Sequence, residues 1–203
     1  MTNHHDDGLR GRIPLSRRNF LAGAGVLAMG AASAGMIAGC SPAPAAESDA
    51  PLIRRLAEVA FPATYREILT PAQLDYMMEW MYGAESLRNQ FREGHVYFIA
   101  SCDGTPCGYV SVQREGEELF HLQKIYVLPD FQGRGVGAAL FRQAVEYIRS
   151  QHPAPCRMEL NVNRHNRALH FYERMGMRKL REGDFPIGNG YYMNDYIMGL
   201  DIR

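Results

Sequence analysis

Three glycines at alternating positions, Gly133, Gly135 and Gly137, have the spacing that most clearly suggests chemistry. They lie where an apolar, strand-like stretch ends and an amphipathic, helix-like stretch begins. Because glycine has no Cβ, a ligand can approach the backbone closely at these positions. The N–H groups at a helix N-terminus, here including those of Arg134 and Ala138, lack partners within the helix and attract anions. The pattern therefore predicts a backbone cradle for a pyrophosphate, although glycines that only allow close helix packing would give a similar run.

Other phosphate-binding and polyanion-binding classes do not fit the sequence. No Gly-Lys-Ser/Thr follows the glycines, as a P-loop requires, and no early strand leads into the dinucleotide-binding Gly-x-Gly-x-x-Gly motif with a downstream acid. The 203 residues carry 22 Lys+Arg and 22 Asp+Glu, a formal charge of zero, so we expect no nucleic-acid partner. The four cysteines do not form Cys-x-x-Cys pairs, so we expect no metal site.

The helices and strands that must position the glycines are predicted from the spacing of apolar residues and from the glycines and prolines that interrupt it. A first helix capped by Asp49, a second beginning at Thr70-Pro71 and a short third over 86–93 precede a run of strands. We expect strands over 96–102, 108–113, 119–128, 157–162, 177–182 and 191–200, helices over 133–150 and 166–175, and a glycine-rich connection over 183–190. This order predicts a mixed α/β layer structure.

Two motifs resemble those of the GNAT superfamily of N-acetyltransferases. Gln132-x-x-Gly135-x-Gly137, after a strand ending in Ile-Tyr-Val-Leu-Pro129, is similar to the family's pyrophosphate motif. Leu-Asn-Val-Asn-x-x-Asn-x-Ala-x-x-Phe-Tyr-x-x-x-Gly over 160–176 is the second match. The resemblance covers about residues 51–203. It implies a central, mostly antiparallel sheet of six or seven strands, flanked by helices and splayed between the fourth and fifth strands.

The resemblance also implies acetyl-CoA as co-substrate and direct transfer of an acetyl group to the primary amine of a small molecule or peptide. Asn166 would contact the cofactor, but it could also simply cap a helix. The strand before the glycines would bind the pantetheine arm through its freed backbone groups. The cofactor-binding residues implied in this way are Ile125, Tyr126, Val127, Gln132, Gly133, Arg134, Gly135, Val136, Gly137, Ala138 and Asn166.

The catalytic groups are implied by the same resemblance. Tyr172 matches the family's general acid, which protonates the departing thiolate; by periodicity alone it would be a core tyrosine. His121 occupies the strand position where the family often has a glutamate acting as base. A histidine can accept a proton near neutral pH, directly or through water. Glu117 and Glu118 in the preceding turn are the alternative candidates.

The acceptor side of the site is less defined by the sequence. In the family the loop after the first helix borders the acceptor, which points to Phe61–Tyr65 and hence to Tyr65. The last strand is rich in Tyr and Asn, and Tyr192, Asn194 and Asp195 are candidate acceptor contacts. Strand alternation puts Tyr192 and Asn194 on one face and Asp195 on the other. Asp195 could receive an ammonium group or hold a strand in place.

Residues 1–40 have the pattern of an export signal. An uncharged run over 21–39 follows several arginines, Ser16–Leu21 resembles a twin-arginine motif, and Ile37–Cys40 resembles a bacterial lipoprotein box. We expect an exported, membrane-anchored lipoprotein with Cys40 diacylated; the alternative is an unprocessed leader and a cytoplasmic protein. Residues 41–50 would be a short tether or an irregular first strand, and 51–203 the acetyltransferase domain.

Export leaves a second reading of the domain open. Acetyl-CoA is a cytosolic metabolite, so the chain could be an exported GNAT-like lipoprotein that binds a ligand without catalysis. Cys102 and Cys107 flank a hairpin turn; we expect reduced thiols, with a bond across the hairpin as the alternative in an oxidising compartment. The sequence is also compatible with a homodimer.

Overall fold

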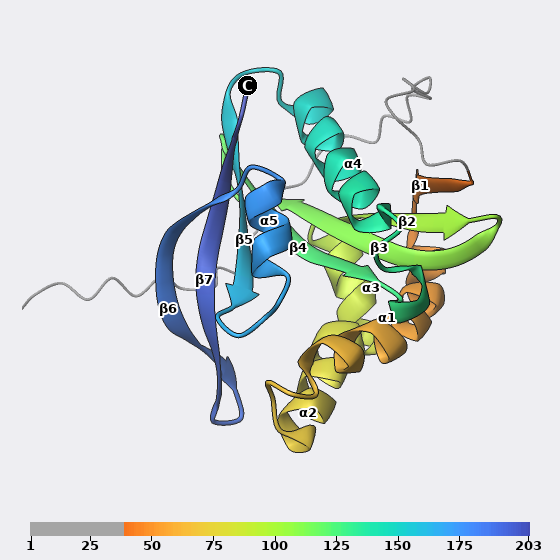
Figure 1. Cartoon of the computed structure of the whole chain (residues 1–203), viewed down its shortest axis with the longest axis vertical. Coiled ribbons are helices and arrows are strands. Elements are labelled where there is room, and N and C mark those ends of the chain that lie inside the picture. Colours follow the sequence, from red (N-terminus) through yellow and green to blue (C-terminus); the bar gives the residue numbers. More distant parts are fainter. Residues whose placement is uncertain (1–38) are drawn as a thin grey trace, which may run out of the picture. The chain divides into compact units, whose positions relative to one another are not determined.

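Seven strands form one mixed sheet in the order β1-β2-β3-β4-β5-β7-β6 (Figure 1). The structure, a computed structural model, describes residues 39–203. Every neighbouring pair is antiparallel except β4 and β5, which are parallel. The strands are β1 (Cys40–Pro44), β2 (Val96–Cys102), β3 (Thr105–Arg114), β4 (Leu119–Val127), β5 (Cys156–Asn163), β6 (Arg178–Gly188) and β7 (Tyr191–Ile202). The mixed α/β fold predicted from the sequence is confirmed.

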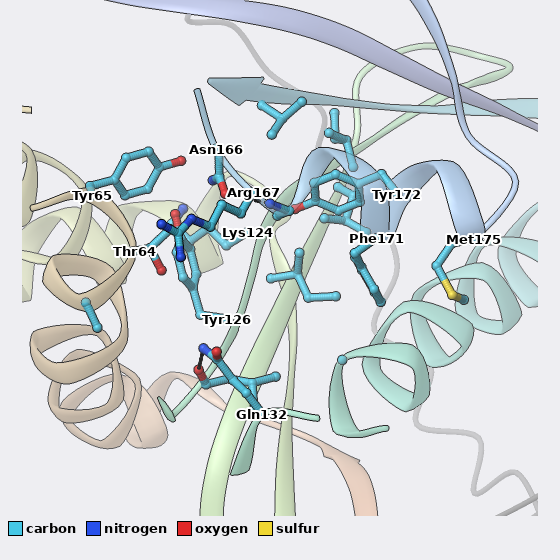
Figure 2. A pocket seen from close by; sticks show the side chains of 18 of the residues that line it. Thr64, Tyr65, Lys124, Tyr126, Gln132, Asn166, Arg167, Phe171, Tyr172 and Met175 are labelled. Carbon is cyan, nitrogen blue, oxygen red and sulfur yellow. Dashed lines mark hydrogen bonds between the residues drawn. The ribbon is translucent and has the colours of Figure 1, made fainter. Parts of the chain in front are cut away.

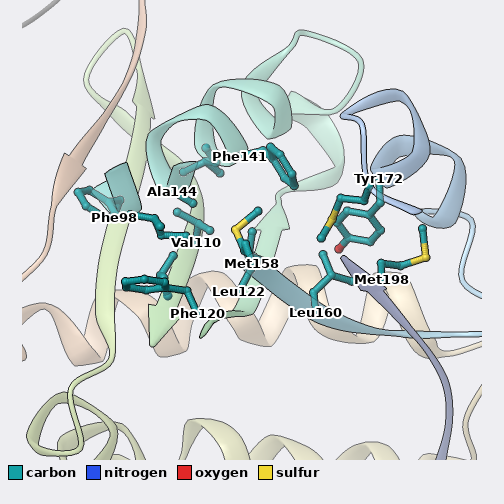
Figure 3. Close-up of a cluster of buried hydrophobic side chains, with 14 of the residues drawn as sticks. Phe98, Val110, Phe120, Leu122, Phe141, Ala144, Met158, Leu160, Tyr172 and Met198 are labelled. Atoms are coloured by element: carbon teal, nitrogen blue, oxygen red, sulfur yellow. The ribbon is translucent and has the colours of Figure 1, made fainter. Parts of the chain in front are cut away.

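Two hydrophobic cores lie on opposite faces of this sheet. Strand β4 contributes to both cores: Leu122 packs in the first and Tyr126 against the second, because the extra residue of a bulge at Gln123 shifts the alternation of side chains. The first core joins the sheet to α4 and α5 through residues such as Phe141 and Met158 (Figure 3). The second joins it to α1, α2 and α3 and is rich in aromatic residues. The helices are α1 (Ala50–Tyr65), α2 (Pro71–Tyr82), α3 (Ala84–Arg92), α4 (Val136–Gln151) and α5 (Leu169–Arg174).

The parallel ladder between β4 and β5 is short. It runs from Leu119 opposite Arg157 to His121 opposite Glu159 and then ends, while β5 continues to Asn163 with β7 as its partner. On its other edge, β4 stays paired with β3 past a bulge that lies between Leu122 and Lys124. The predicted splay between the fourth and fifth strands is therefore confirmed.

The first strand is regular despite its two prolines. The amide of Ala45 donates to the carbonyl of Tyr97 at 2.9 Å, and that of Asp103 donates to the carbonyl of Gly39 at 2.7 Å. Odd-numbered positions of this segment thus bond to β2, and the nitrogens of Pro42 and Pro44 point to the outer edge of the sheet. The sequence left a short tether or an irregular first strand open for residues 41–50; residues 41–44 form that first strand, and its pairing with β2 is regular.

Other boundaries differ from the sequence expectation for local reasons. The predicted helix over 133–150 begins only at Val136, because Gly133 and Gly135 have positive φ angles of 73° and 78°. The predicted glycine-rich connection over 183–190 is wrong: β6 continues to Gly188, and the turn is Asn189-Gly190. Asn189 and Gly190 both adopt positive φ, as a tight hairpin turn requires.

Cys40 forms a disulfide with Cys102 across β1 and β2. A sulfur in a disulfide cannot also carry a lipid thioether, so the structure stands against the expected diacylation of Cys40. The expectation that Cys102 is a reduced thiol is wrong for the same reason, and Cys107 remains a free, buried thiol with its Sγ 3.3 Å from that of Cys102. The twin-arginine motif and residues 37–38 of the lipoprotein box lie outside the described residues. Within residues 39–203, no helix is both long and apolar enough to cross a membrane.

We predict that Cys40→Ser lowers the free energy of unfolding by about 2–4 kcal/mol under oxidising conditions, because the bond closes a loop of 62 residues in the unfolded chain. Denaturant unfolding with and without a thiol reductant measures this. The variant and the wild type should differ much less in reductant. Peptide mapping without reduction should recover Cys40 linked to Cys102, and recovery of diacylated Cys40 would contradict the assignment.

Candidate functional site

A cleft of about 1020 Å³ opens where β4 and β5 part (Figure 2). Its walls come from the end of β4, the loop before α4, the end of β5, α5 and the C-terminal end of α1. The structure therefore brings most of the sequence-predicted site residues to one place. Those that line the cleft are Tyr65, Ile125, Tyr126, Val127, Gln132, Gly133, Gly135, Gly137, Ala138, Asn166 and Tyr172.

The N-terminus of α4 is built as an anion site. Gly135 is its N-cap in the left-handed region, at φ 78° and ψ 0°, which a residue with a Cβ adopts at a cost. The first helical bond is from the amide of Ala139 to the carbonyl of Gly135, so the amides of residues 136–138 have no partner within the helix. A Cβ at Gly133 would meet no atom within 4 Å, which leaves the approach to these amides open.

Two predicted cofactor contacts are not in the cleft wall. The Arg134 side chain is exposed and its guanidinium carbon lies 5.3 Å from the centre of the Phe131 ring. The Val136 side chain is buried in the first core. Neither side chain lines the cleft, and the contribution of both residues is limited to the backbone of the turn.

The edge of β4 that faces the cleft has no strand partner beyond His121. Ile125, Tyr126 and Val127 therefore present main-chain groups to the opening. The pantetheine arm expected from the sequence has amide groups of its own, which need such hydrogen-bond partners. The carbonyl of Val127 is the exception, because the side-chain amide of Gln132 donates to it at 3.1 Å. Gln132 thus fixes the loop to the end of the strand.

Tyr172 lies on α5, opposite Tyr65 across the cleft (Figure 2). It is only 7% exposed and its ring packs edge-on to Phe171, with centroids 5.3 Å apart. Burial raises the pKa of its hydroxyl, which keeps the hydroxyl protonated and able to donate. Asn166 fixes the turn before α5, since its Oδ1 accepts from the amide of Ala168 at 2.9 Å. Tyr172 is thus packed as a core tyrosine and Asn166 holds the turn; both also line the cleft, and their roles in catalysis and cofactor binding stay predictions.

His121 is not brought to this cleft. Its Nδ1 lies 3.5 Å from an Oε of Glu115, a residue that the sequence analysis did not single out, and it does not line the cleft. Glu117 and Glu118 are exposed in the turn before β4. The geometry gives none of these groups a position beside Tyr172.

Lys124 is a cleft-lining residue that sequence reasoning missed. It is buried, its Nζ donates to Oε1 of Gln90 at 2.7 Å, and it lies 5.8 Å from the ring centres of Tyr82 and Tyr97. Burial lowers its pKa to about 7. The neighbouring His95 has its pKa lowered to about 3, first by burial and then by the charge of Lys124. A lysine within an apolar strand was the signal available in the sequence.

The candidate acceptor residues separate into two groups. Tyr192 is 54% exposed, and the side-chain amide of Asn194 donates to Asp184 at 2.7 Å, so both lie on the outer face of β7. Asp195 lies on the inner face and is buried, as the predicted alternation requires. Tyr65 is buried at the end of α1 and lines the cleft. Of these four residues only Tyr65 lines the cleft, and Asp195 lies behind Asn161, which does line it.

Comparison with known families identifies the class of protein. Residues 53–177 match the acetyltransferase (GNAT) family, which is more than half of the chain. The chain therefore belongs to the acetyltransferase (GNAT) family. An uncharacterized N-acetyltransferase of Methanocaldococcus jannaschii is 30% identical over 94 residues, which are 43% of this chain and 41% of that protein. The chain thus matches less than half the length of that relative.

Solved structures share the fold. The PaiA N-acetyltransferase of Thermoplasma acidophilum, in complex with coenzyme A, superposes with a TM-score of 0.65 at 20% identity, covering 79% of this chain and 97% of that one. A putative acetyltransferase from Salmonella typhimurium, yncA, with its cofactor acetyl-CoA, gives a TM-score of 0.55 at 16% identity, covering 81% and 95%. At these identities the likeness shows the fold, and the fold expected from the sequence is confirmed.

We predict that Lys124→Met makes the protein more stable at pH 7, because it replaces a buried amine with an apolar side chain of similar length. The lowered pKa of Lys124 means that the folded state binds fewer protons than the unfolded state between about pH 7 and its ordinary value. The free energy of unfolding of the wild type should therefore increase relative to that of the variant as pH rises toward 10. Thermal unfolding across this range measures the difference.

The control is Lys179→Met, which removes the chain's other lysine, an exposed one on β6. The difference in thermal stability between Lys179→Met and the wild type should not show this dependence on pH. A Lys124→Met variant that is less stable than the wild type at pH 7 would contradict the assignment of a costly buried amine.

Proposed function

We propose that this chain transfers the acetyl group of acetyl-CoA directly to a primary amine of a small molecule or peptide. The observation that carries the proposal is that three features open into one cleft: the unpaired edge of β4, the partnerless amides at the start of α4, and the hydroxyl-bearing side chain of Tyr172. The coenzyme A in the Thermoplasma structure and the acetyl-CoA in the Salmonella structure support the choice of cofactor.

Different groups of the chain would bind different parts of the cofactor. The pyrophosphate would lie on the amides of residues 136–138, where the helix dipole favours negative charge. The pantetheine arm would run along the main chain of Ile125–Val127 as an added strand. An N–H of β4 would then donate to the thioester carbonyl oxygen and stabilise the negative charge that develops there when the amine attacks.

Tyr172 would act as the general acid. The neutral amine nitrogen bonds to the acetyl carbon, the carbon–sulfur bond breaks, and the departing thiolate takes the phenolic proton of Tyr172. The amine nitrogen loses its extra proton to water, and Tyr172 regains a proton from water. The raised pKa of this hydroxyl supports the role, because the proton is in place before the reaction begins. His121 has no part in this proposal, since it pairs with Glu115 and does not line the cleft.

Export remains part of the proposal for the whole chain. The disulfide between Cys40 and Cys102 is typical of an oxidising compartment and supports export, without a lipid on that cysteine. In such a compartment acetyl-CoA is scarce, which favours a non-catalytic binding module as the second candidate function. Calorimetry with acetyl-CoA and with CoA, followed by an assay of CoA release with a panel of primary amines, distinguishes them. Binding without release from any amine supports the module.

We predict that Gly133→Ala weakens acetyl-CoA binding by about tenfold, because Gly133 lines the cleft and a Cβ there would occupy space that the glycine leaves to a ligand. Isothermal titration calorimetry measures the Kd. The matched control is Gly94→Ala: Gly94 also has positive φ and open space around its Cβ position, but it does not line the cleft. Both variants should lose similar stability, and equal Kd values for the two would refute the cradle.

We also predict that Tyr172→Phe lowers kcat by about 10²–10⁴-fold while the Kd for acetyl-CoA changes little, since the hydroxyl acts only when the thiolate departs. The measurement is CoA release alongside calorimetry. Tyr147→Phe is the control, because Tyr147 is a half-buried tyrosine on α4 outside the cleft. A Tyr172→Phe variant with loss of binding equal to its loss of turnover would remove Tyr172 as the acid.

A further inference from the structure

Three cysteines meet at one end of the first core. Cys102, the last residue of β2, forms the disulfide with Cys40 of β1, and the free thiol of Cys107 on β3 lies with its Sγ 3.3 Å from the Sγ of Cys102. Cys102 and Cys107 are buried, and Cys40 is partly buried against the same core. A thiol is therefore in direct contact with a disulfide sulfur, and attack of a thiolate on such a sulfur is the first event of thiol–disulfide exchange.

A bulge in the sheet produces this contact. The pairing of β2 with β3 shifts by one residue between Ala100 and Ser101, and this shift leaves Cys107 as an extra residue on β3. In an unbroken ladder Cys107 would pair with Ser101, and its side chain would lie on the opposite face of the sheet from that of Cys102. A bulge redirects side chains, and here it brings both sulfurs into the first core.

The Cys107 thiol is held only weakly in its place. Its Sγ donates to the carbonyl of Ala100 at 3.4 Å, and a thiol is a weak donor. Burial raises the pKa of this thiol, and because the thiolate is the attacking form, burial makes exchange slow in the closed protein. A buried cysteine can also fill a core without reacting. Cys107 differs from Cys156, the other free cysteine of residues 39–203, because it touches a disulfide.

The two partners available to Cys102 depend differently on the fold. The bond to Cys40 closes a loop of 62 residues, whereas Cys107 is only 5 residues from Cys102 in the sequence. Loop closure costs more entropy in a longer loop, so the short pairing forms more readily when β1 is not docked. In the folded protein the pairing of β1 with β2 holds Cys40 opposite Cys102. The position of β1 therefore selects the partner of Cys102.

We propose that Cys102 exchanges between Cys40 and Cys107, and that this exchange releases β1 from its covalent link and leaves Cys40 as a modifiable thiol. Cys107 loses its proton to water, and its thiolate attacks the Sγ of Cys102. The bond between Cys102 and Cys107 forms, the bond between Cys40 and Cys102 breaks, and the departing Cys40 thiolate takes a proton from water. One disulfide replaces another, so the step consumes no oxidant and no reductant. The inference is independent of the proposed acetyl transfer.

The test traps the released thiol. The oxidised full chain, freed of small thiols, is incubated with excess iodoacetamide at about pH 8, where more of the thiol ionises, then unfolded in acid and mapped without reduction. We expect Cys40 to become alkylated over minutes to hours, the time scale of disulfide rearrangement, with Cys102 linked to Cys107 in the same molecules. If Cys40 stays linked to Cys102, whether Cys107 is free or alkylated, the inference is wrong.

Two variants identify the attacking thiol. Cys107→Ser keeps a small side chain and removes the thiol that touches the disulfide, so the rate of Cys40 alkylation should fall by about tenfold or more. Cys156→Ser is the matched control, because it removes the other free, buried cysteine of residues 39–203 and should release Cys40 at the wild-type rate. Equal rates of Cys40 alkylation in Cys107→Ser and the wild type would overturn the inference.

Two further measurements remain available if Cys107→Ser does not fold. Exchange within one molecule is first order, so dilution of the wild type by about tenfold should leave the rate of Cys40 release unchanged. A rate that falls on dilution would show exchange between molecules and refute the inference. In Cys40→Ser, glutathione disulfide should convert Cys102 and Cys107 into a disulfide. Mixed disulfides with glutathione alone would show that these two sulfurs do not bond in this fold, which also refutes the inference.

Discussion

The site depends on one interruption of hydrogen bonding, the end of the parallel ladder between β4 and β5 after His121 and Glu159. A continuous ladder would satisfy the main chain of β4 and leave no opening beside it. Since β4 remains paired with β3, the strand is still held on one edge while the other edge faces the cleft. The interruption also sets the cleft beside the N-terminus of α4, so that main-chain groups from a strand and from a helix line the same opening.

Much of this arrangement could be predicted from the sequence, because it is local. The glycines before α4 determine their own backbone conformation, and Gly135 has the left-handed geometry that its residue type allows. Strand alternation predicted that Asp195 lies on the opposite face of β7 from Tyr192 and Asn194, and in the structure Asp195 is on the buried face. Tyr172 is the clearest case in which periodicity was insufficient: packing alone makes it a core residue, and only the motif gave it a chemical role.

The remainder depends on contacts between distant segments, which spacing does not encode. Cys40 and Cys102 are 62 residues apart and meet only because β1 pairs with β2 in one register. Lys124 is buried because α3 places Gln90 against it. In both cases the determining neighbour comes from another element of the fold. His121 differs: its partner Glu115 lies in the turn that leads into β4, a local contact that the sequence analysis did not consider.

The outward-facing prolines of β1 have a consequence for self-association. A strand from another molecule can extend a sheet only by pairing with main-chain donors on its outermost member, and positions 42 and 44 present none. At the opposite border, β6 carries Lys179, Glu182 and Asp184, charges that a docking strand would have to accommodate. Both borders of the sheet formed by residues 39–203 therefore disfavour edge-to-edge pairing with another molecule.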